Sequence, residues 1–167
     1  MPVSPGGTNY DNDELDALFQ AVGFVVVQWG QSEQSLDFAT RILYKHLGGK
    51  ALAKRLPKML DTKLEFIEKC LAKLPTLARF RADGERLVAD FRNLSATRHD
   101  LIHGAITSVS MTNGGFDFMK LDFNNDDHVV REFRFEGEDF PKLTKDLINL
   151  CAGTTAFAQQ LSKLVQK

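Results

Sequence analysis

The chain has 167 residues, of which 43% are hydrophobic and 26% are charged, and its formal net charge is -1. These values fit one globular domain with a substantial core, and they argue against disordered, fibrous and strongly basic classes of protein. No apolar run approaches the roughly 18 residues that span a bilayer, and residues 1–8 lack the features of a signal peptide. The two cysteines, Cys70 and Cys151, suggest neither a disulfide scaffold nor a zinc site, so a cytoplasmic protein is expected.

The first half of the chain predicts long helices. Residues 1–10 are expected to be a flexible tail, ahead of a single helical domain over residues 11–167. Apolar residues then recur at helical spacing, within about 120° of one another, which predicts one long amphipathic helix that ends at Gly48-Gly49. Gly23 and Gly30 on this helix either allow another helix to approach closely or weaken it locally.

Further helical patterns follow over residues 51–73, with a break near Pro57, and over residues 76–103, with Gly84 as a candidate interruption. The pattern then changes to rough alternation between turn signals, which predicts two or three antiparallel strands at about 105–136. A last helix is predicted from about Pro141 to Val165. The expected fold is mainly α, an antiparallel helix bundle with a small β-meander or hairpin inserted before the last helix.

Charge is segregated along the chain, although the total is close to zero. Residues 49–98 hold twelve basic and six acidic residues, whereas residues 104–140 hold three basic and eight acidic residues. The basic block is either a local phosphate-binding surface or a set of solvated helix faces paired to acidic neighbours, and the second interpretation is favoured before any motif is considered.

Two charged residues fall inside apolar stripes of the predicted helices. Glu33 lies on the stripe of the first long helix, and Arg98 lies on the stripe of the helix over residues 76–103. Each charge is costly to bury alone, so the simplest expectation is a structural ion pair between Glu33 and Arg98. Such a pair fixes the register of two helices and does not exclude a functional role.

Three side chains near the end of the helix over residues 76–103 share one face. Arg92, His99 and His103 fall within about 40° on the helical wheel, so they form a cationic and titratable strip. No set of ligands has diagnostic metal-binding spacing, and neither a phosphate-binding glycine loop nor a nucleophile elbow is present, so neither metal nor cofactor is expected.

An arginine and a histidine suffice for phosphodiester chemistry without a metal. A histidine with a pKa near neutrality takes a proton from a ribose 2′-hydroxyl or gives one to the leaving oxygen, while an arginine holds the phosphate. The alternative for His103 is a helix C-terminal residue that interacts with the last carbonyls and the helix dipole, and geometry alone favours that alternative.

The segment Arg98-His99-Asp100-Leu101-Ile102-His103 resembles the R-x4-H signature of the HEPN superfamily, and the residues from Trp29 to Leu36 are similar to the opening helix of bacterial HEPN-like proteins. The resemblance implies a helical bundle and a homodimer in which two motifs face each other across a cleft. It implies a catalytic pair of Arg98 and His103, with His99 as a polar helper. Arg92-Asn93 through His99 is a second, lower-ranked match, from which Arg92 and Asn93 are expected to bind substrate.

The resemblance also implies a function. Many members of the superfamily are metal-independent endoribonucleases that act as toxins of toxin–antitoxin pairs or in phage defence. The expected partners are therefore a second copy of the chain, single-stranded RNA and an antitoxin protein, with no membrane. Other members do not cleave RNA, so the competing expectation is a non-catalytic HEPN-like module for dimerisation or for nucleotide or RNA binding.

Overall fold

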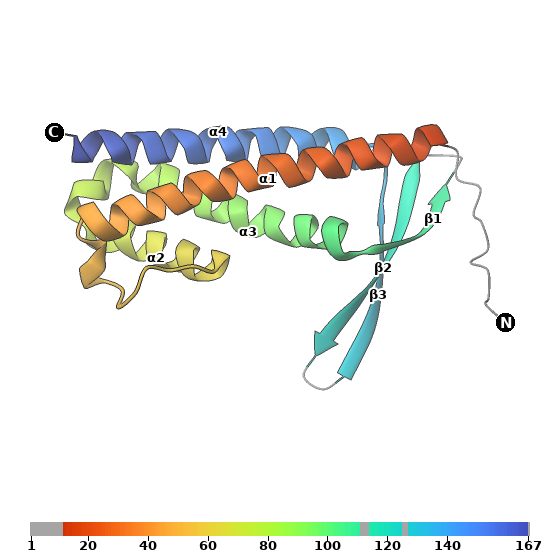
Figure 1. Cartoon of the computed structure of the whole chain (residues 1–167), viewed down its shortest axis with the longest axis horizontal. Helices are drawn as coiled ribbons and strands as arrows, with labels where there is room; N and C mark the ends of the chain where they lie inside the picture. Colours follow the sequence, from red (N-terminus) through yellow and green to blue (C-terminus); the bar gives the residue numbers. More distant parts are fainter. Residues whose placement is uncertain (1–11, 111–113, 125–126, 167) are drawn as a thin grey trace.

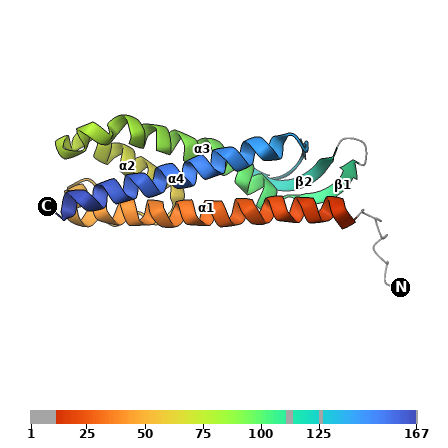
Figure 2. The same cartoon turned by 90° about the horizontal axis from the view of Figure 1, so that it is seen from above.

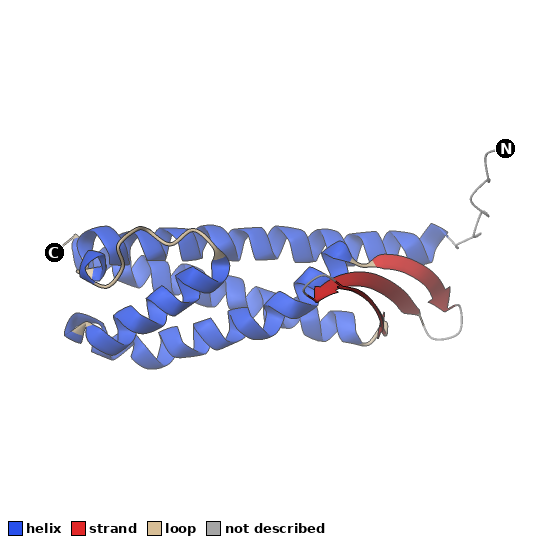
Figure 3. Cartoon of the chain, turned by 90° about the horizontal axis from the view of Figure 1, so that it is seen from below, coloured by secondary structure: helices blue, strands red, loops and turns tan. Residues whose placement is uncertain are grey.

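The computed structural model describes residues 12–110, 114–124 and 127–166. The predicted tail at residues 1–10 lies outside the described residues. The elements in chain order are α1 (Asn12–His46), η1 (Gly49–Ala51), α2 (Leu60–Lys73), η2 (Pro75–Phe80), α3 (Arg81–His103), β1 (Ala105–Ser110), β2 (Gly115–Asn124), β3 (Asp127–Phe135) and α4 (Asp139–Val165). The fold is mainly α with a β insertion before the last helix, as predicted (Figures 1 and 3).

The helices form an elongated bundle in which α3 runs opposite to the other three (Figures 1 and 2). α3 is therefore antiparallel to each of the other three helices, as expected from the sequence, whereas α1, α2 and α4 are parallel to one another. Ser35 of α1 hydrogen-bonds to Thr155 of α4, and Gln31 accepts a hydrogen bond from Cys151, so residue numbers increase in the same direction along both helices. Long connections explain the parallel pairs, because residues 47–59 return the chain along the bundle before α2 begins.

The core lies where the apolar stripes of the four helices meet. Trp29 of α1 contacts Phe91 of α3 edge to face, with ring centroids 5.5 Å apart. Aliphatic side chains from all four helices surround this pair and are fully buried, among them Leu36, Leu43, Ile67, Leu71, Val88, Leu147 and Leu161. None of the described helices combines the length and apolar character that crossing a bilayer requires.

The structure corrects the expectation for Gly84 and excludes one of the two alternatives for Gly23 and Gly30. Gly84 does not interrupt α3, since it is buried within the helix and a Cβ there would lie 2.5 Å from a terminal carbon of Leu71 in α2. This contact explains the residue type, because it lets α2 and α3 approach closely. Gly23 and Gly30 are not sites of close approach, because a Cβ at either would meet no atom of the described chain within 4 Å.

The three strands form an antiparallel sheet in the order β1-β2-β3 at one end of the bundle (Figure 3). Its inner face is aromatic, with Phe116 and Phe118 buried and the Phe118 and Phe133 rings stacked at 5.3 Å. Strand β1 pairs with β2 only as far as Met119, whereas β2 and β3 continue to Asn124 and Asp127. The outer part of this hairpin extends away from the helices and carries exposed apolar side chains, including Phe123, which is 75% exposed (Figure 1).

Candidate active site

The sequence motif forms the last turn of α3, where the helix meets the sheet. Leu101 is buried and anchors this turn, while His99 and His103 are exposed. The helix ends at Gly104, whose backbone N–H donates to the carbonyl of Asp100 at 2.8 Å. A Cβ at Gly104 would lie 2.7 Å from that carbonyl oxygen and 2.8 Å from the ring of Phe133. The backbone conformation does not require glycine here, because a φ of -76° is open to any residue. Glycine is required because a side chain would collide with the carbonyl of Asp100 and the ring of Phe133.

The two histidines of the motif lie side by side on the surface. Their ring centroids are 4.5 Å apart, as the i and i+4 spacing predicted. The Nδ1 atom of His99 lies 2.7 Å from Nζ of Lys120 in β2. An ammonium group only donates, so Nδ1 accepts and the neutral ring carries its proton on Nε2. Desolvation, and then the positive charge of Lys120, hold the pKa of His99 below its ordinary value of 6.5.

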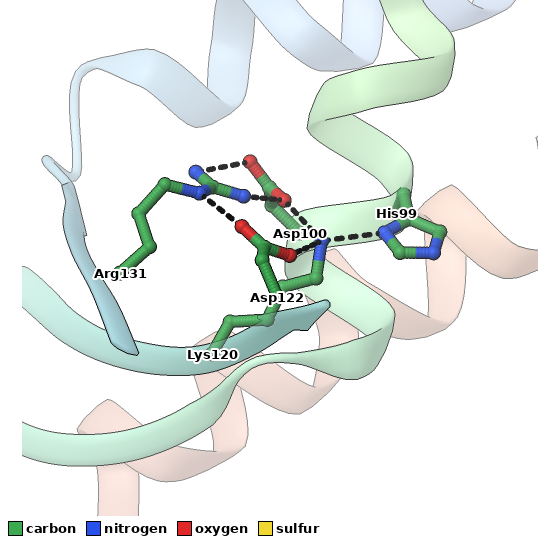
Figure 4. Close-up of polar contacts among 5 residues, drawn as sticks. All are labelled: His99, Asp100, Lys120, Asp122 and Arg131. Atoms are coloured by element: carbon green, nitrogen blue, oxygen red, sulfur yellow. Dashed lines mark hydrogen bonds and ion pairs between the residues drawn. The ribbon is translucent and has the colours of Figure 1, made fainter. Parts of the chain in front are cut away.

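Asp100 joins the end of α3 to the sheet through a network of charges (Figure 4). Its carboxylate accepts two hydrogen bonds from the Arg131 guanidinium, at 2.5 and 3.0 Å, and one from Lys120 at 3.0 Å. Asp122 completes the network, because it lies 2.8 Å from Arg131 and 3.1 Å from Lys120. The hydrogen bonds from Arg131 are the main reason that the pKa of Asp100 is lowered. The network fixes the sheet against α3 and holds His99 in place through Lys120.

Arg98 lies between this surface and the core. It is half-buried, and its guanidinium carbon lies 5.9 Å from the centroid of the Trp29 ring. Its Nε atom is buried without a hydrogen-bond partner. Within the described ranges, no carboxylate oxygen lies within 4.0 Å of an Arg98 nitrogen. Arg98 therefore keeps hydrogen-bonding capacity that no described residue uses.

The expected ion pair between Glu33 and Arg98 is not formed, since it is not among the salt bridges of the described residues. The expectation assumed that both charges are deeply buried. Both side chains are instead half-buried, so each retains contact with solvent and neither requires the other. The guanidinium of Arg98 lies against Trp29, one helical turn before Glu33.

Arg92 does not complete the predicted strip with the histidines. Its guanidinium binds Glu68 of α2 through two parallel hydrogen bonds of 2.6 and 2.7 Å, so it ties α3 to α2. That pair lowers the pKa of Glu68. Asn93 is exposed on α3, about one and a half turns before the motif begins at Arg98. Of the five residues expected at the site, the structure thus brings His99 and His103 together and places Arg98 next to His99. It leaves Asn93 apart from them and commits Arg92 to another contact.

Other reactive groups do not add to this site. Within the described part of the chain, His, Cys, Asp and Glu form no group of three or more that could hold a metal ion. Both cysteines are free, and burial raises the pKa of Cys70 to about 12. A buried thiol with such a pKa is not a nucleophile at neutral pH.

Lys120, Asp122 and Arg131 were missed by sequence reasoning. The signal that exists is the i, i+2 spacing of Lys120 and Asp122, which places both on one face of a strand. The register of the sheet then sets Arg131 opposite Lys120. That register, and the packing of this face on α3, cannot be deduced from the spacing alone.

Three comparisons were made with known proteins. No family model, no curated protein and no solved structure matches this chain.

Proposed function

We propose that the chain is a metal-independent endoribonuclease of the HEPN type, which cleaves single-stranded RNA at Arg98 and His103. The observation that carries the proposal is that Arg98, alone among the arginines near the sheet, has no carboxylate partner in the described chain and lies within the last two turns of α3, next to His99 and five positions before His103, whose imidazoles are both exposed. An arginine so placed is available for a phosphate, which guanidinium groups bind in a bidentate manner.

The side chains divide the reaction between them. Arg98 holds the phosphate and offsets the negative charge that develops on its oxygens. Neutral His103 takes the proton of the 2′-hydroxyl while the 2′-oxygen forms a bond to phosphorus and the bond to the 5′-oxygen breaks. His99 does not act as the base, because Lys120 occupies its Nδ1 and its Nε2 carries the proton. His99 instead donates that proton in a hydrogen bond to a phosphate oxygen and so positions the substrate.

A second copy of the chain completes the site in this proposal. The leaving 5′-oxygen needs a proton, and a protonated His103 of the second copy supplies it across the cleft between two motifs. Exposed apolar residues on the hairpin support such a dimer, since Leu121, Phe123 and Val130 lie on the sheet face opposite to the one that Asp100 binds and have no cover among the described residues. Light scattering should give twice the mass of the chain at micromolar concentration. The interface of such a dimer should bury more than roughly 1,000 Å² in total.

The proposal is tested by RNA cleavage in the presence of EDTA. Wild-type protein should cleave, because the residues in the proposed roles need no metal. The variant His103→Ala should lose about 10²- to 10⁴-fold in rate, the usual contribution of one acid–base group. Its melting temperature should match that of the wild type, since His103 is exposed. An exposed histidine in another element, His46→Ala, is the matched control and should cleave normally. Full activity of His103→Ala would contradict the catalytic assignment.

The second candidate is a non-catalytic HEPN-like module, with dimerisation or RNA binding as its role. The observation in its favour is that His99 and Asp100 already contact the sheet through Lys120 and Arg131, which is a structural use of the motif. This candidate predicts that wild-type protein leaves RNA intact under all conditions. A toxin or phage-defence role and an antitoxin partner belong to the first candidate, and growth arrest on overexpression that depends on His103 is their test.

A further inference from the structure

The end of the bundle opposite the sheet carries a concentration of positive charge. Residues 41–63 contain seven lysines and arginines and a single carboxylate, Asp61. Six of these cations are exposed, and we call their surface the basic end: Arg41 and Lys45 of α1, Lys50 of η1, and Lys54, Arg55 and Lys58 of the segment before α2. The basic end lies at the C-terminal end of α1, away from the motif at the end of α3 (Figure 1).

None of these six cations has a carboxylate within 4.0 Å in the parts of the chain that the structure describes. The seventh, Lys63, is largely buried and forms an ion pair with Asp37. The solvated-face interpretation of the basic block included pairing with acidic neighbours. That pairing occurs for Arg92 with Glu68 and for Arg86 with Asp83, but not at the basic end.

The segment that carries four of these cations, residues 49–58, is anchored at its start. Gly49 is buried, and a Cβ there would lie 2.6 Å from both the carbonyl oxygen of Leu43 and the ring of Phe66. Lys69 of α2 donates to the carbonyl of Leu52 at 3.1 Å. These contacts fix Gly49 against α1 and Leu52 against α2, so the start of the segment has a defined place from which the chain runs back along the bundle.

Two shallow hollows lie on either side of this segment. One, with a volume of about 260 Å³, lies against α1 and has Arg41 and Lys58 among its lining residues, together with the pair of Asp37 and Lys63. The other, of about 390 Å³, lies against α2 and includes Arg55 in its lining. Phe38 is 51% exposed on α1 and lies one helical turn before Arg41. An exposed aromatic ring beside cations is the combination that binds single-stranded nucleic acid, since bases stack while phosphates pair with the cations.

We propose that the basic end binds the sugar–phosphate backbone of single-stranded RNA. This inference rests on the proposed function for the choice of RNA, and it adds a binding surface that is separate from the cleavage residues. Phosphates spaced along a strand match cations that are spread over three elements. The occupant is RNA rather than an anionic membrane because a base can stack on the exposed Phe38 ring beside the cations, whereas a basic surface without a lipid chain or an apolar helix face holds a membrane only weakly.

The test measures binding without cleavage. Fluorescence anisotropy with a labelled 2′-O-methyl oligouridine of about 20 nucleotides, a length that spans several binding sites, removes the attacking hydroxyl from the assay. The variant Arg41→Gln/Lys58→Gln should raise Kd at least about tenfold at 0.1 M salt and reduce the slope of log K against log salt by about 1.4, because each lost phosphate contact removes about 0.7. The control Lys142→Gln/Lys145→Gln removes the same charge from exposed positions of α4 and should change Kd less than about twofold.

Phe38→Ala should weaken binding to the single strand at least about fivefold, the smallest effect expected from the loss of one stacked base. Each contrary result overturns the proposal: no binding by wild-type protein at low salt, equal weakening by the two charge variants, an unchanged affinity of Phe38→Ala, or binding to phosphatidylglycerol vesicles in place of RNA. The proposed cleavage stands or falls separately. If wild-type protein binds RNA but never cleaves it, and Arg41→Gln/Lys58→Gln loses that binding, the binding surface is supported and the proposed nuclease activity is contradicted.

Discussion

The sheet end and the basic end of the molecule treat positive charge in opposite ways. Every lysine and arginine of the three strands is ion-paired: Lys120 and Arg131 with Asp100 and Asp122, and Arg134 with Asp117 and Glu136. At the basic end, six exposed cations have no carboxylate partner within the described residues. A paired cation contributes to folding, whereas an exposed unpaired cation is available to a ligand. The presence or absence of a carboxylate partner therefore distinguishes cations that stabilise the fold from cations that are candidates for binding a ligand.

Arg98 is the exception that gives the sheet end its candidate function. It lies beside the paired network yet has no carboxylate of its own among the described residues, and its buried Nε atom lacks a partner. The neighbouring network holds His99 neutral and in position. Arg98 and the ion-paired Asp100 thus lie within one helical turn. Mutations at the two positions should distinguish an effect on RNA cleavage from an effect on stability.

Among the variants that change the charges compared above, Arg98→Ala should have the largest effect. RNA cleavage should fall about 10²- to 10³-fold, as happens when one donor to the transition-state charge is removed. The free energy of unfolding should fall by only about 1 kcal/mol, because the variant loses a cation–π contact with Trp29 and no ion pair. Cleavage kinetics and urea unfolding measure the two effects. A stability loss above about 3 kcal/mol, typical of a broken buried ion pair, would show that Arg98 has a structural partner.

Asp100→Asn should give the largest loss of stability at the sheet end. The substitution removes the charge that binds both Arg131 and Lys120, at a side chain that is only 17% exposed. The expected loss is about 2 kcal/mol, the usual range for hydrogen bonds to a charged group. Arg55→Gln at the basic end is the matched control, and its stability should equal that of the wild type. Equal stabilities of both variants, measured by urea unfolding, would contradict the distinction between paired and unpaired charges.

Arg92→Gln should have a smaller effect. The pair with Glu68 is bidentate but exposed, so its loss should cost less than about 1 kcal/mol of unfolding free energy. RNA cleavage should be unchanged, because Arg92 is committed to α2. Cleavage that falls by tenfold or more in this variant would restore Arg92 to the substrate-binding role that the sequence suggested.

The smallest expected effect is a pH dependence from His99. Its pKa in the folded protein is below the ordinary value of 6.5, so between the two values the unfolded chain binds more protons than the native one. The free energy of unfolding should therefore rise with pH across this window, and the contribution of His99 should reach its full value above pH 6.5. The groups that set this behaviour are Lys120, His103, Asp100 and Arg98.

The variant His99→Gln keeps an acceptor for Lys120 and does not titrate, so this part of the slope should vanish. Urea unfolding at several pH values between about 5 and 7.5, which brackets the ordinary histidine pKa, measures it. An identical slope in wild type and His99→Gln would show that His99 does not differ between the folded and unfolded states.

Much of the fold could be predicted from the sequence, because periodicity reports directly on which face of an element is buried. The long first helix and the strands before the last helix are confirmed, whereas the helical structure predicted on the N-terminal side of Pro57 is wrong, because residues 52–59 form no helix and α2 begins at Leu60. The direction of α1 relative to α2 and α4 could not be deduced, since it depends on the path of residues 47–59. The Glu33–Arg98 pair was inferred from two positions on helical wheels, and a wheel does not show how much solvent reaches a side chain.

The partners of the motif were beyond sequence reasoning for a related reason. Asp100 lies within the motif itself, yet the cations that bind it come from β2 and β3, twenty or more positions later. Only the strand register and the packing of the sheet on α3 bring them together. The contact between the His99 and His103 rings could be predicted, because it depends only on the i and i+4 spacing in a helix.

The identity of the reaction product tests the central claim most directly. Wild-type protein is incubated with EDTA and an RNA oligonucleotide, and the fragments are analysed by mass spectrometry. The account predicts fragments that end in a 2′,3′-cyclic phosphate, and no cleavage when the nucleotide at the cut site carries a 2′-deoxy sugar, because the attacking oxygen comes from the substrate. Fragments with a 5′-phosphate, or cleavage of the 2′-deoxy substrate, would contradict the roles assigned to Arg98 and His103.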